Sequence, residues 1–458
     1  MVAVREPSGK SRKRVRRRDA PRAVEQQPSP PAEDLTPPPI ELASVAAREL
    51  AGAVDEALPA ATRAYRWFHR HPELSSAEVE TARHLANELR VLGLEVTEHI
   101  GGTGVVGVLE GSGGDGPTVL VRADMDALPV TEETGLPYAS ANRGVMHACG
   151  HDVHMACAIG ALRVLSARKQ GLRGRILFVG QPAEETSVGA RAVLEDRSFR
   201  QILARTGTPV VAIALHDASD LPAGVVSLLA GYAHANIDTL DITVFGRGGH
   251  AARPHLACDP IVLGAEIVLS LQTIVSRRLP AGERAVVTVG QFAAGNKHNV
   301  IPDRATLLIT VRSYREVTRR RLLDEIARIA RHVARAHDAP RDPAVVVRDE
   351  HTPAAYNDPA WTARLAALFR HALGPERVES HEPSLGGEDF GRFSATLGIP
   401  GVMWKLGAVD PRRFDGDKLH ELPALHSPRF APAARPTLRT GILTLALAVE
   451  DVLRHPEM

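Results

Sequence analysis

The stretch TVLVRAD (118–124) decides how this chain is expected to fold. Its apolar residues are continuous rather than alternating, which is typical of a strand buried on both faces. Two runs of the same kind follow, RILFVGQ (175–181) and VVAIALH (210–216), and helical stretches separate them, notably residues 152–168. Buried strands that alternate with helices predict a parallel sheet in an α/β domain.

A helix is expected before the first of these strands, over LSSAEVETARHLANELRVLG (74–93). Ser75 and Glu78 have the spacing of a capping box, an apolar stripe begins at Leu85, and Gly93 supplies the stop. Just before the first of these strands, GSGGDG (111–116) matches a dinucleotide-binding fingerprint. That fingerprint must open a helix, whereas a strand follows here at once, so we interpret the glycines as a turn.

The pattern changes over residues 231–350. It predicts a βαββαβ order: strand 237–245, helix 260–278, strands 285–292 and 305–313, a helix with Leu322, Ile326, Ile329 and Val333 in step, and strand 344–348. This order suits a small ferredoxin-like α+β domain. Because the α/β pattern resumes afterwards, we expect the small domain to be inserted into a discontinuous α/β domain made of residues 43–230 and 351–458.

Residues 1–42 differ from the rest in composition. RKRVRRR (12–18) is a basic block and QPSPPAEDLTPPP (27–39) is rich in proline, so we expect a disordered arm. Such a block could contact nucleic acid or anionic lipid, but a solubilising tail is the simpler interpretation. No apolar stretch follows it as in a secretory signal.

Composition narrows the class of protein. The 458 residues are 44% hydrophobic and 24% charged with a formal net charge of +1, which favours a globular protein without a nucleic-acid partner. We see no apolar run of membrane-spanning length, so no membrane association is expected. Three cysteines, an odd number, fit a reducing compartment, and the cytoplasm is the expected location.

The expected strands run into side chains that can bind metals. Asp124 and Asp126 follow the first strand, Glu184 and Glu185 follow the second, and the third ends at His216. Each alone could be a surface carboxylate, a helix cap or an ordinary histidine. Ligands of an open α/β sheet gather beyond the carboxyl ends of its strands, so the coincidence predicts a metal centre.

The loop MHACGHDVHMA (146–156) could reach the same edge of the sheet. It offers Cys149 and His151 just before a helix. The plain alternative is a buried small cysteine among scattered histidines. His147 and His151 have zincin spacing, but Ala148 replaces the glutamate, so that motif fails. We interpret His154 as structural or as support for a ligand.

At this point the chain resembles a known family. HPELS, RADMDALP, MHACGHDVHMA, QPAEE, GRGGHAARPH, NVIPD, GGEDF and LHSPRF follow one another as do the motifs of the metal-dependent aminoacylase-type amidohydrolases and metallopeptidases. That family includes hippurate hydrolases, N-acyl-amino-acid amidohydrolases and auxin-conjugate hydrolases. The resemblance covers about residues 60–435 and leaves the arm outside.

The resemblance implies a dinuclear centre. Its metal ligands would be Cys149, His151, Glu185, His216 and His426. A thiolate beside imidazole and carboxylate donors suits zinc or manganese, with cobalt or nickel as further options, and argues against magnesium or calcium. A metal-bound thiol is deprotonated, which gives Cys149 a chemical reason to be there.

The resemblance also implies catalytic roles. Glu184 would be the general base and proton shuttle, and Asp126 would orient a metal ligand, with Asp124 a weaker candidate. His250 would donate a hydrogen bond to the developing oxyanion, reaching across from a partner subunit, so a homodimer through the small domain is expected. Arg253 and Asn299 are candidates for binding a substrate carboxylate, because arginine offers a bidentate, always-charged clamp.

The expected function is hydrolysis of the amide bond of an N-acyl-amino acid to a carboxylic acid and an amino acid. A dipeptidase or carboxypeptidase of the same family would use the same metals and differ in its pocket walls. A non-catalytic metal-binding scaffold is the third alternative, and Glu184 argues against it, because a binder needs no base. Nothing in the sequence identifies the acyl group.

Overall fold

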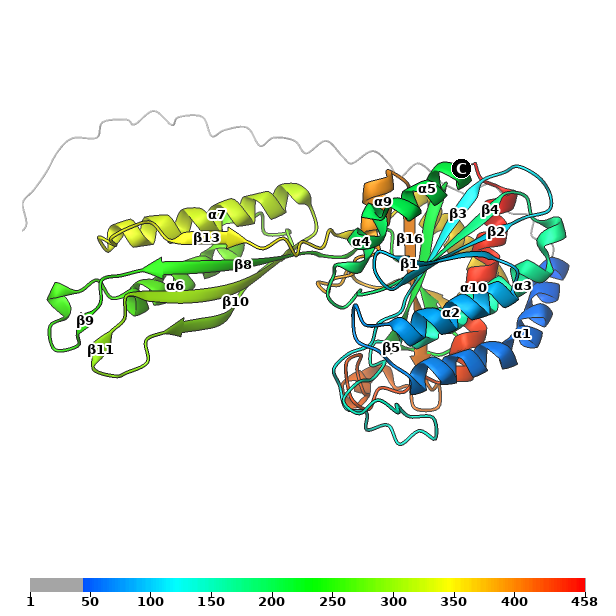
Figure 1. The fold of residues 1–458 in the computed structure, drawn as a ribbon, viewed down its shortest axis with the longest axis horizontal. Helices are drawn as coiled ribbons and strands as arrows, with labels where there is room; N and C mark the ends of the chain where they lie inside the picture. The colour runs from blue at the N-terminus through cyan, green and yellow to red at the C-terminus, as the bar shows by residue number, and fades with distance from the viewer. Residues whose placement is uncertain (1–43, 458) are drawn as a thin grey trace, which may run out of the picture. The chain divides into compact units, whose positions relative to one another are not determined.

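The computed structural model describes residues 44–457. The arm expected over residues 1–42 lies outside the described residues. Figure 1 traces two sheets with separate sets of helices.

The larger sheet has eight strands in the order β1-β2-β4-β3-β5-β16-β6-β15. Pairing is parallel for β3 with β4 and β5, for β5 with β16 and for β6 with β15, while β1–β2, β2–β4 and β6–β16 are antiparallel. The bounds are β1 (Glu95–Ile100), β2 (Gly104–Glu110), β3 (Thr118–Asp124), β4 (Arg175–Gln181), β5 (Val211–Pro222), β6 (Val226–Ser227), β15 (Val378–Glu379) and β16 (Gly401–Val409).

Successive residues of β3 serve two different hydrophobic cores. Val119 and Val121 belong to the core under one set of helices, whereas Leu120 belongs to the core on the opposite face. The first set is α1 (Ser44–Arg70), α2 (Val79–Val91), α3 (His151–Ala167), α8 (Pro359–Leu373) and α10 (Ala434–Arg454). The second is α4 (Gly189–Glu195), α5 (Arg197–Thr206) and α9 (Gly391–Leu397). Burial on both faces explains the continuous apolar run.

The smaller sheet has the strand order β10-β12-β8-β13, with every neighbouring pair antiparallel. Its elements are β8 (Asn236–Phe245), α6 (Pro260–Arg278), β10 (Ala285–Ala294), β12 (Arg304–Ser313), α7 (Glu316–Ala336) and β13 (Ala344–Val347). One hydrophobic core joins the sheet to both helices. The βαββαβ order and this strand order are those of a ferredoxin-like unit, as predicted.

Short elements complete the described chain. They are β7 (Gly231–His234) paired with β14 (Ala355–Asn357), β9 (Gly249–His250) paired with β11 (Val300–Ile301), and the 3₁₀ turns η1 (Lys169–Gly171), η2 (Pro254–Leu256), η3 (Pro375–Arg377) and η4 (Gly416–Glu421). By length and composition alone, one described helix, α6, could cross a membrane, and a third of its apolar window is buried. Such a test is weak evidence when one helix passes it.

Two local predictions are wrong. The strand expected to end at His216 continues to Pro222, because β16 keeps pairing with β5 as far as that residue. The capping box at Ser75 and Glu78 does not form, and α2 begins at Val79 without a side-chain cap. Instead, Ser75 Oγ donates to Asp126 Oδ2 at 2.7 Å, and the Glu78 carboxylate accepts from backbone N–H groups, including that of Ala183 at 2.8 Å.

Candidate metal centre

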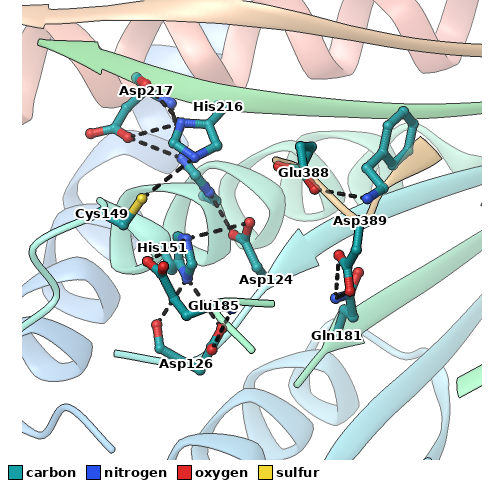
Figure 2. A network of polar contacts seen from close by, with 12 residues as sticks. Asp124, Asp126, Cys149, His151, Gln181, Glu185, His216, Asp217, Glu388 and Asp389 are labelled. Carbon is teal, nitrogen blue, oxygen red and sulfur yellow. Dashed lines mark hydrogen bonds and ion pairs between the residues drawn. The ribbon is translucent and has the colours of Figure 1, made fainter. Parts of the chain in front are cut away.

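Cys149 and His151 reach the carboxyl edge of the large sheet from the loop that opens α3. Gly150 between them has φ +78°, and a Cβ there would collide with the Asp217 carboxylate. Glycine is therefore the residue that allows both the left-handed backbone and the close approach. The turn presents the thiol and the imidazole to the same space, and Figure 2 shows Cys149 and His216 pointing toward one another.

Among the groups of possible metal donors that the described residues form, two groups of three share the Cys149 sulfur. In each group the donor atoms lie within 4.8 Å of one another; the groups are Cys149, His151 and His216, and Cys149, Glu185 and His426. Cys149 Sγ lies 3.7 Å from His216 Nε2 and 3.3 Å from His426 Nε2. Ligands at ordinary zinc bond lengths in a tetrahedron are about 3.4 Å apart, so this spacing fits an ion in each group.

The histidine rings are held so that one nitrogen of each faces the cluster. His151 Nδ1 lies 2.9 Å from the Asp126 backbone oxygen and 3.3 Å from Asp126 Oδ1, and His216 Nδ1 lies 2.8 Å from the Asp217 backbone oxygen. His151 Nε2 and Glu185 Oε1 are buried without a hydrogen-bond partner in the described chain. Buried polar atoms rarely stay unpaired, and a bound cation would satisfy both.

The thiol also fits a metal. Burial raises the pKa of Cys149 well above its usual range, so the side chain would stay protonated without a nearby cation. Two residues of the candidate centre have an unusual backbone: Ala183, just before the two glutamates, has φ +49°, and His426 has φ +68°. Non-glycine residues avoid this region, and such strain concentrates at functional sites.

Glu184 differs from its neighbour Glu185. Its side chain is buried, lines the cavity and makes no hydrogen bond to any residue that the structure describes. Burial, and then the negative charges of Glu388 and Asp389, raise the pKa of the Glu184 carboxyl well above its usual range. The carboxylate is therefore next to the metal donors and free to exchange a proton.

A buried polar network behind the centre was not predicted from the sequence. The Arg122 guanidinium is buried and lies 2.7 Å from Asp124 Oδ2, 2.9 Å from Glu388 Oε1 and 3.1 Å from Asp389 Oδ1. Three carboxylates face one guanidinium, and burial raises the pKa of Asp389 to about 7, so this carboxyl can hold a proton near neutrality. The network joins the end of β3 to the GGEDF segment. Figure 2 shows Asp389 beside Gln181.

His154 lies between the end of β3 and the middle of β5. Its Nδ1 lies 2.6 Å from Asp124 Oδ1, and its Nε2 accepts the Asp217 backbone N–H at 2.9 Å. Asp124 Oδ2 in turn lies 3.6 Å from His151 Nε2, so Asp124 contacts a ligand candidate while Asp126 fixes the other side of the same ring. His154 is thus placed to support the centre from behind.

A second buried histidine, His69, lies between two carboxylates. His69 Nδ1 lies 2.7 Å from Asp152 Oδ2, and its Nε2 lies 3.1 Å from Glu132 Oε1. Burial alone would lower the pKa of His69, but the bonds to both carboxylates raise it to about 9. Asp152 directly follows the ligand candidate His151, so this triad anchors the start of α3 to α1.

We expect the free energy of unfolding to fall as pH rises from about 6.5, the unfolded-state pKa of histidine, toward 9. A raised folded-state pKa stabilises the protein fully below the unfolded-state pKa, and this contribution is lost above the folded-state pKa; its upper limit is about 3 kcal/mol. Urea unfolding in chelator at several pH values measures it. His69→Gln should flatten the slope, while His371→Gln, at an exposed site, should keep it. If the free energy of unfolding of His69→Gln has the same pH dependence as that of the wild type, a group other than His69 is responsible for it.

The cluster opens onto a cavity of about 580 Å³. Glu184, Glu185, His216 and His426 line it, and its lining also includes two cations, Arg312 and Lys405. The sequence singled out neither cation. A guanidinium inside a strand of otherwise apolar or small residues, TLLITVRS, could have drawn attention to Arg312.

The remaining predicted residues lie elsewhere in this chain. His250 is in β9, Arg253 follows it, and Asn299 precedes β11; all three are exposed and do not line the cavity. His250 pairs with Val300 across the two short strands, so the three residues share one part of the small α+β unit. A single chain does not bring them to the donor cluster.

An α/β sheet with thiol, imidazole and carboxylate donors at its edge, beside a cavity with a free carboxylate, defines a metal-dependent amidohydrolase. The sequence profile of peptidase family M20/M25/M40 matches residues 120–446. The chain belongs to this family.

Relatives of known name cover most of the chain. A probable hydrolase of Synechocystis is 36% identical over 87% of this chain and 97% of its own. An N-acetylcysteine deacetylase of Bacillus subtilis is 36% identical over 75% of this chain and 86% of its own, and a hippurate hydrolase of Campylobacter jejuni is 36% identical over 71% and 82%. Their names agree with an amide-hydrolysing enzyme.

Solved structures show the same fold. A protein of methicillin-resistant Staphylococcus aureus, described as a putative aminohydrolase, has a TM-score of 0.78 at 31% identity, covering 88% of this chain and 99% of its own. A Bacillus subtilis protein described as a dinuclear metal binding peptidase of the M20 family has a TM-score of 0.70 at 30% identity, covering 87% and 99%. The expected fold class, a discontinuous α/β catalytic domain, is confirmed by these likenesses.

Proposed function

We propose that this enzyme hydrolyses the amide bond of N-acyl-amino acids. The observation that carries the proposal is the pair of donor groups sharing Cys149, which face a cavity that also holds the free carboxylate of Glu184. The names of the N-acetylcysteine deacetylase and the hippurate hydrolase support the substrate class. One amide bond is broken, giving a carboxylic acid and an amino acid.

Two divalent ions would be held by Cys149, His151, Glu185, His216 and His426. When bound, such a pair lowers the pKa of a water molecule and polarises the amide carbonyl. The mixed donor set fits zinc or manganese, with cobalt or nickel as alternatives. Asp126 keeps the His151 ring in the orientation that turns Nε2 toward the donor cluster.

Glu184 acts as the general base in this proposal. Its buried carboxylate takes the proton of the attacking water and delivers it to the leaving nitrogen, so the base is regenerated in each cycle. The adjacent Glu185 is committed to metal, which explains why two neighbouring glutamates are not redundant. A scaffold without catalysis would have no use for a buried, unpartnered Glu184.

The substrate carboxylate needs a cation, and Arg312 is well placed to provide it. Arg312 lines the cavity and donates one hydrogen bond from Nη1 to the Leu385 backbone oxygen at 2.7 Å. No carboxylate among the described residues pairs with its guanidinium. A planar guanidinium fixed at one nitrogen leaves its other donors for a carboxylate. Arg253 and Asn299 would contribute from a second subunit.

We also propose that the protein is a homodimer. The two chains would contact each other through the small domain of residues 231–350, which is inserted between the catalytic parts 43–230 and 351–458. The exposed position of His250 supports this, because the side chain cannot serve the cavity of its own chain as the structure stands. All three cysteines are free, which suits the cytoplasm.

Mixing two inactive variants tests the dimer. His250→Ala and Glu184→Gln chains, co-expressed, should regain activity, because the heterodimer holds one site with an intact Glu184 and an intact His250 from the partner. Random pairing should restore about a quarter of the wild-type sites. Either variant expressed alone is the control. Absence of any rescue in a verified heterodimer would mean that His250 acts within its own chain.

The substrate class is tested by free amino acid released from a panel. The manganese- or zinc-loaded enzyme is given acetyl-, benzoyl- and long-chain acyl-amino acids, together with dipeptides. Turnover of one class of acyl-amino acid confirms the proposal and identifies the acyl group that the cavity accepts. Turnover of dipeptides alone would favour the peptidase alternative, which has support from a carboxypeptidase of Saccharolobus solfataricus, 35% identical over 76% of this chain.

A further inference from the structure

Lys405 is a charged residue in the middle of an apolar strand. Within β16, GVMWKLGAV (401–409), every residue is buried except Lys405 and Val409. β16 is an internal strand, and Lys405 lies opposite His216 of β5 on one side and Ser227 of β6 on the other. Core packing would favour an apolar side chain at such a position, so the lysine needs another explanation.

The ammonium group of Lys405 has little to neutralise it. Its one ion pair within the described chain is with Asp220 Oδ2 at 3.7 Å, and the Asp220 side chain is 57% exposed while that of Lys405 is only 25% exposed. Lys405 donates no hydrogen bond to any residue that the structure describes. A charge removed from water without a close partner is unfavourable, so the site is better satisfied when an anion enters.

The neighbours of Lys405 indicate where in the cavity such an anion would bind. Lys405 and His216 are register partners on neighbouring strands, so their side chains lie on the same face of the sheet, and both line the cavity. His381 lines the same wall and contacts Ser227 Oγ through Nδ1 at 3.0 Å. The anion site is therefore beside the metal donors and distinct from Arg312, which comes from β12 of the smaller sheet.

A simple N-acyl-amino acid has one carboxylate, whereas the cavity has two cations: Arg312 pairs with no carboxylate of the described residues, and Lys405 pairs only with the largely exposed Asp220. We propose that Lys405 is a specificity-determining residue that binds a second carboxylate of the substrate, so that the preferred substrates are dicarboxylic N-acyl-amino acids. The second carboxylate could belong to the amino-acid side chain or to the acyl group. This inference rests on the proposed function, because it refines the substrate class of the same cavity.

Two pairs of substrates distinguish a second carboxylate on the amino-acid side chain from one on the acyl group. N-acetylglutamate and N-acetylglutamine differ in a side-chain charge, and N-succinylalanine and N-butyrylalanine differ in a charge on the acyl group. In one pair we expect the wild-type enzyme to favour the anionic member in kcat/KM by about 10- to 100-fold, the range for a charge-assisted hydrogen bond. Lys405→Met should reduce that ratio at least tenfold. Asp220→Asn, which removes the competing carboxylate, should maintain or increase it.

Lys169→Met, an exposed lysine in η1, is the matched control and should keep the wild-type ratio. A ratio near one in both pairs, or a ratio that Lys405→Met leaves unchanged, would overturn the proposal. Calorimetric binding to the Glu184→Gln protein separates it from the proposed function. Suppose that the wild-type enzyme hydrolyses none of the four compounds, yet the anionic member of a pair binds the Glu184→Gln protein at least tenfold more tightly than the neutral member. If the added Lys405→Met substitution abolishes this difference in affinity, the amidase proposal fails and the anion site stands.

Discussion

Replacing Cys149 with serine is expected to remove most of the bound metal. Cys149 Sγ is the donor common to both groups, so its loss takes one ligand from each presumed ion position at once. A serine hydroxyl does not ionise near neutral pH and is a poor substitute for a thiolate. After dialysis against trace metal, the wild type should hold two ions per chain, and Cys149→Ser should hold fewer than one by elemental analysis.

Cys157, on the helix α3 that follows Cys149, offers a matched control. It is fully buried in the apolar core of α3, and its sulfur lies 4.0 Å from the Leu438 backbone oxygen, away from the donor groups. Cys157→Ser should lower stability through burial of a hydroxyl but retain two ions. Unchanged metal stoichiometry in Cys149→Ser, with folding verified by circular dichroism, would remove Cys149 from the ligand set.

The sequence predicted those helices and strands whose ends are fixed by residues close to them in the chain. β3 and β4 have the expected bounds because their apolar runs end at polar turns, and α6 begins at Pro260 because Asp259 caps it, its Oδ1 accepting the Ile261 N–H at 2.8 Å. The end of β5 was not predictable in this way. Asp217 and the residues after it are too polar to suggest a strand, and only the pairing with β16, far away in the sequence, keeps them extended.

The structure brings the predicted donor residues together with Asp126 and His154, which were also predicted from the sequence, whereas other residues around the cluster were not predicted. Cysteine, histidine and glutamate at strand ends carry a chemical signal that can be read one residue at a time. Arg122, Asp217 and Glu388 carry no such signal, because each has meaning only through its partners. Arg122 contacts Glu388 across 266 positions of sequence, and no spacing rule connects the two. The position of His250 illustrates the same limit, since its proposed partner is a second chain.

We expect the substitution of glutamate by glutamine to have opposite effects on metal content at positions 184 and 185. Glu185→Gln should lose metal, because the carboxylate is one of three donors in its group and an amide is a weaker ligand. Glu184→Gln should keep both ions and the fold, because the side chain makes no hydrogen bond that the described structure depends on. Comparing the two therefore separates metal binding from proton transfer at adjacent positions.

Glu184→Gln is expected to lower kcat by about 10²- to 10⁴-fold, the contribution of a general base. The glutamine amide has nearly the shape of the carboxyl group but cannot accept the proton of the attacking water, so substrate still enters the cavity while turnover is much slower. KM and metal content should stay close to wild type, and Glu195→Gln on α4 should leave kcat unchanged. Near-normal turnover by Glu184→Gln with two ions bound would remove Glu184 as the base.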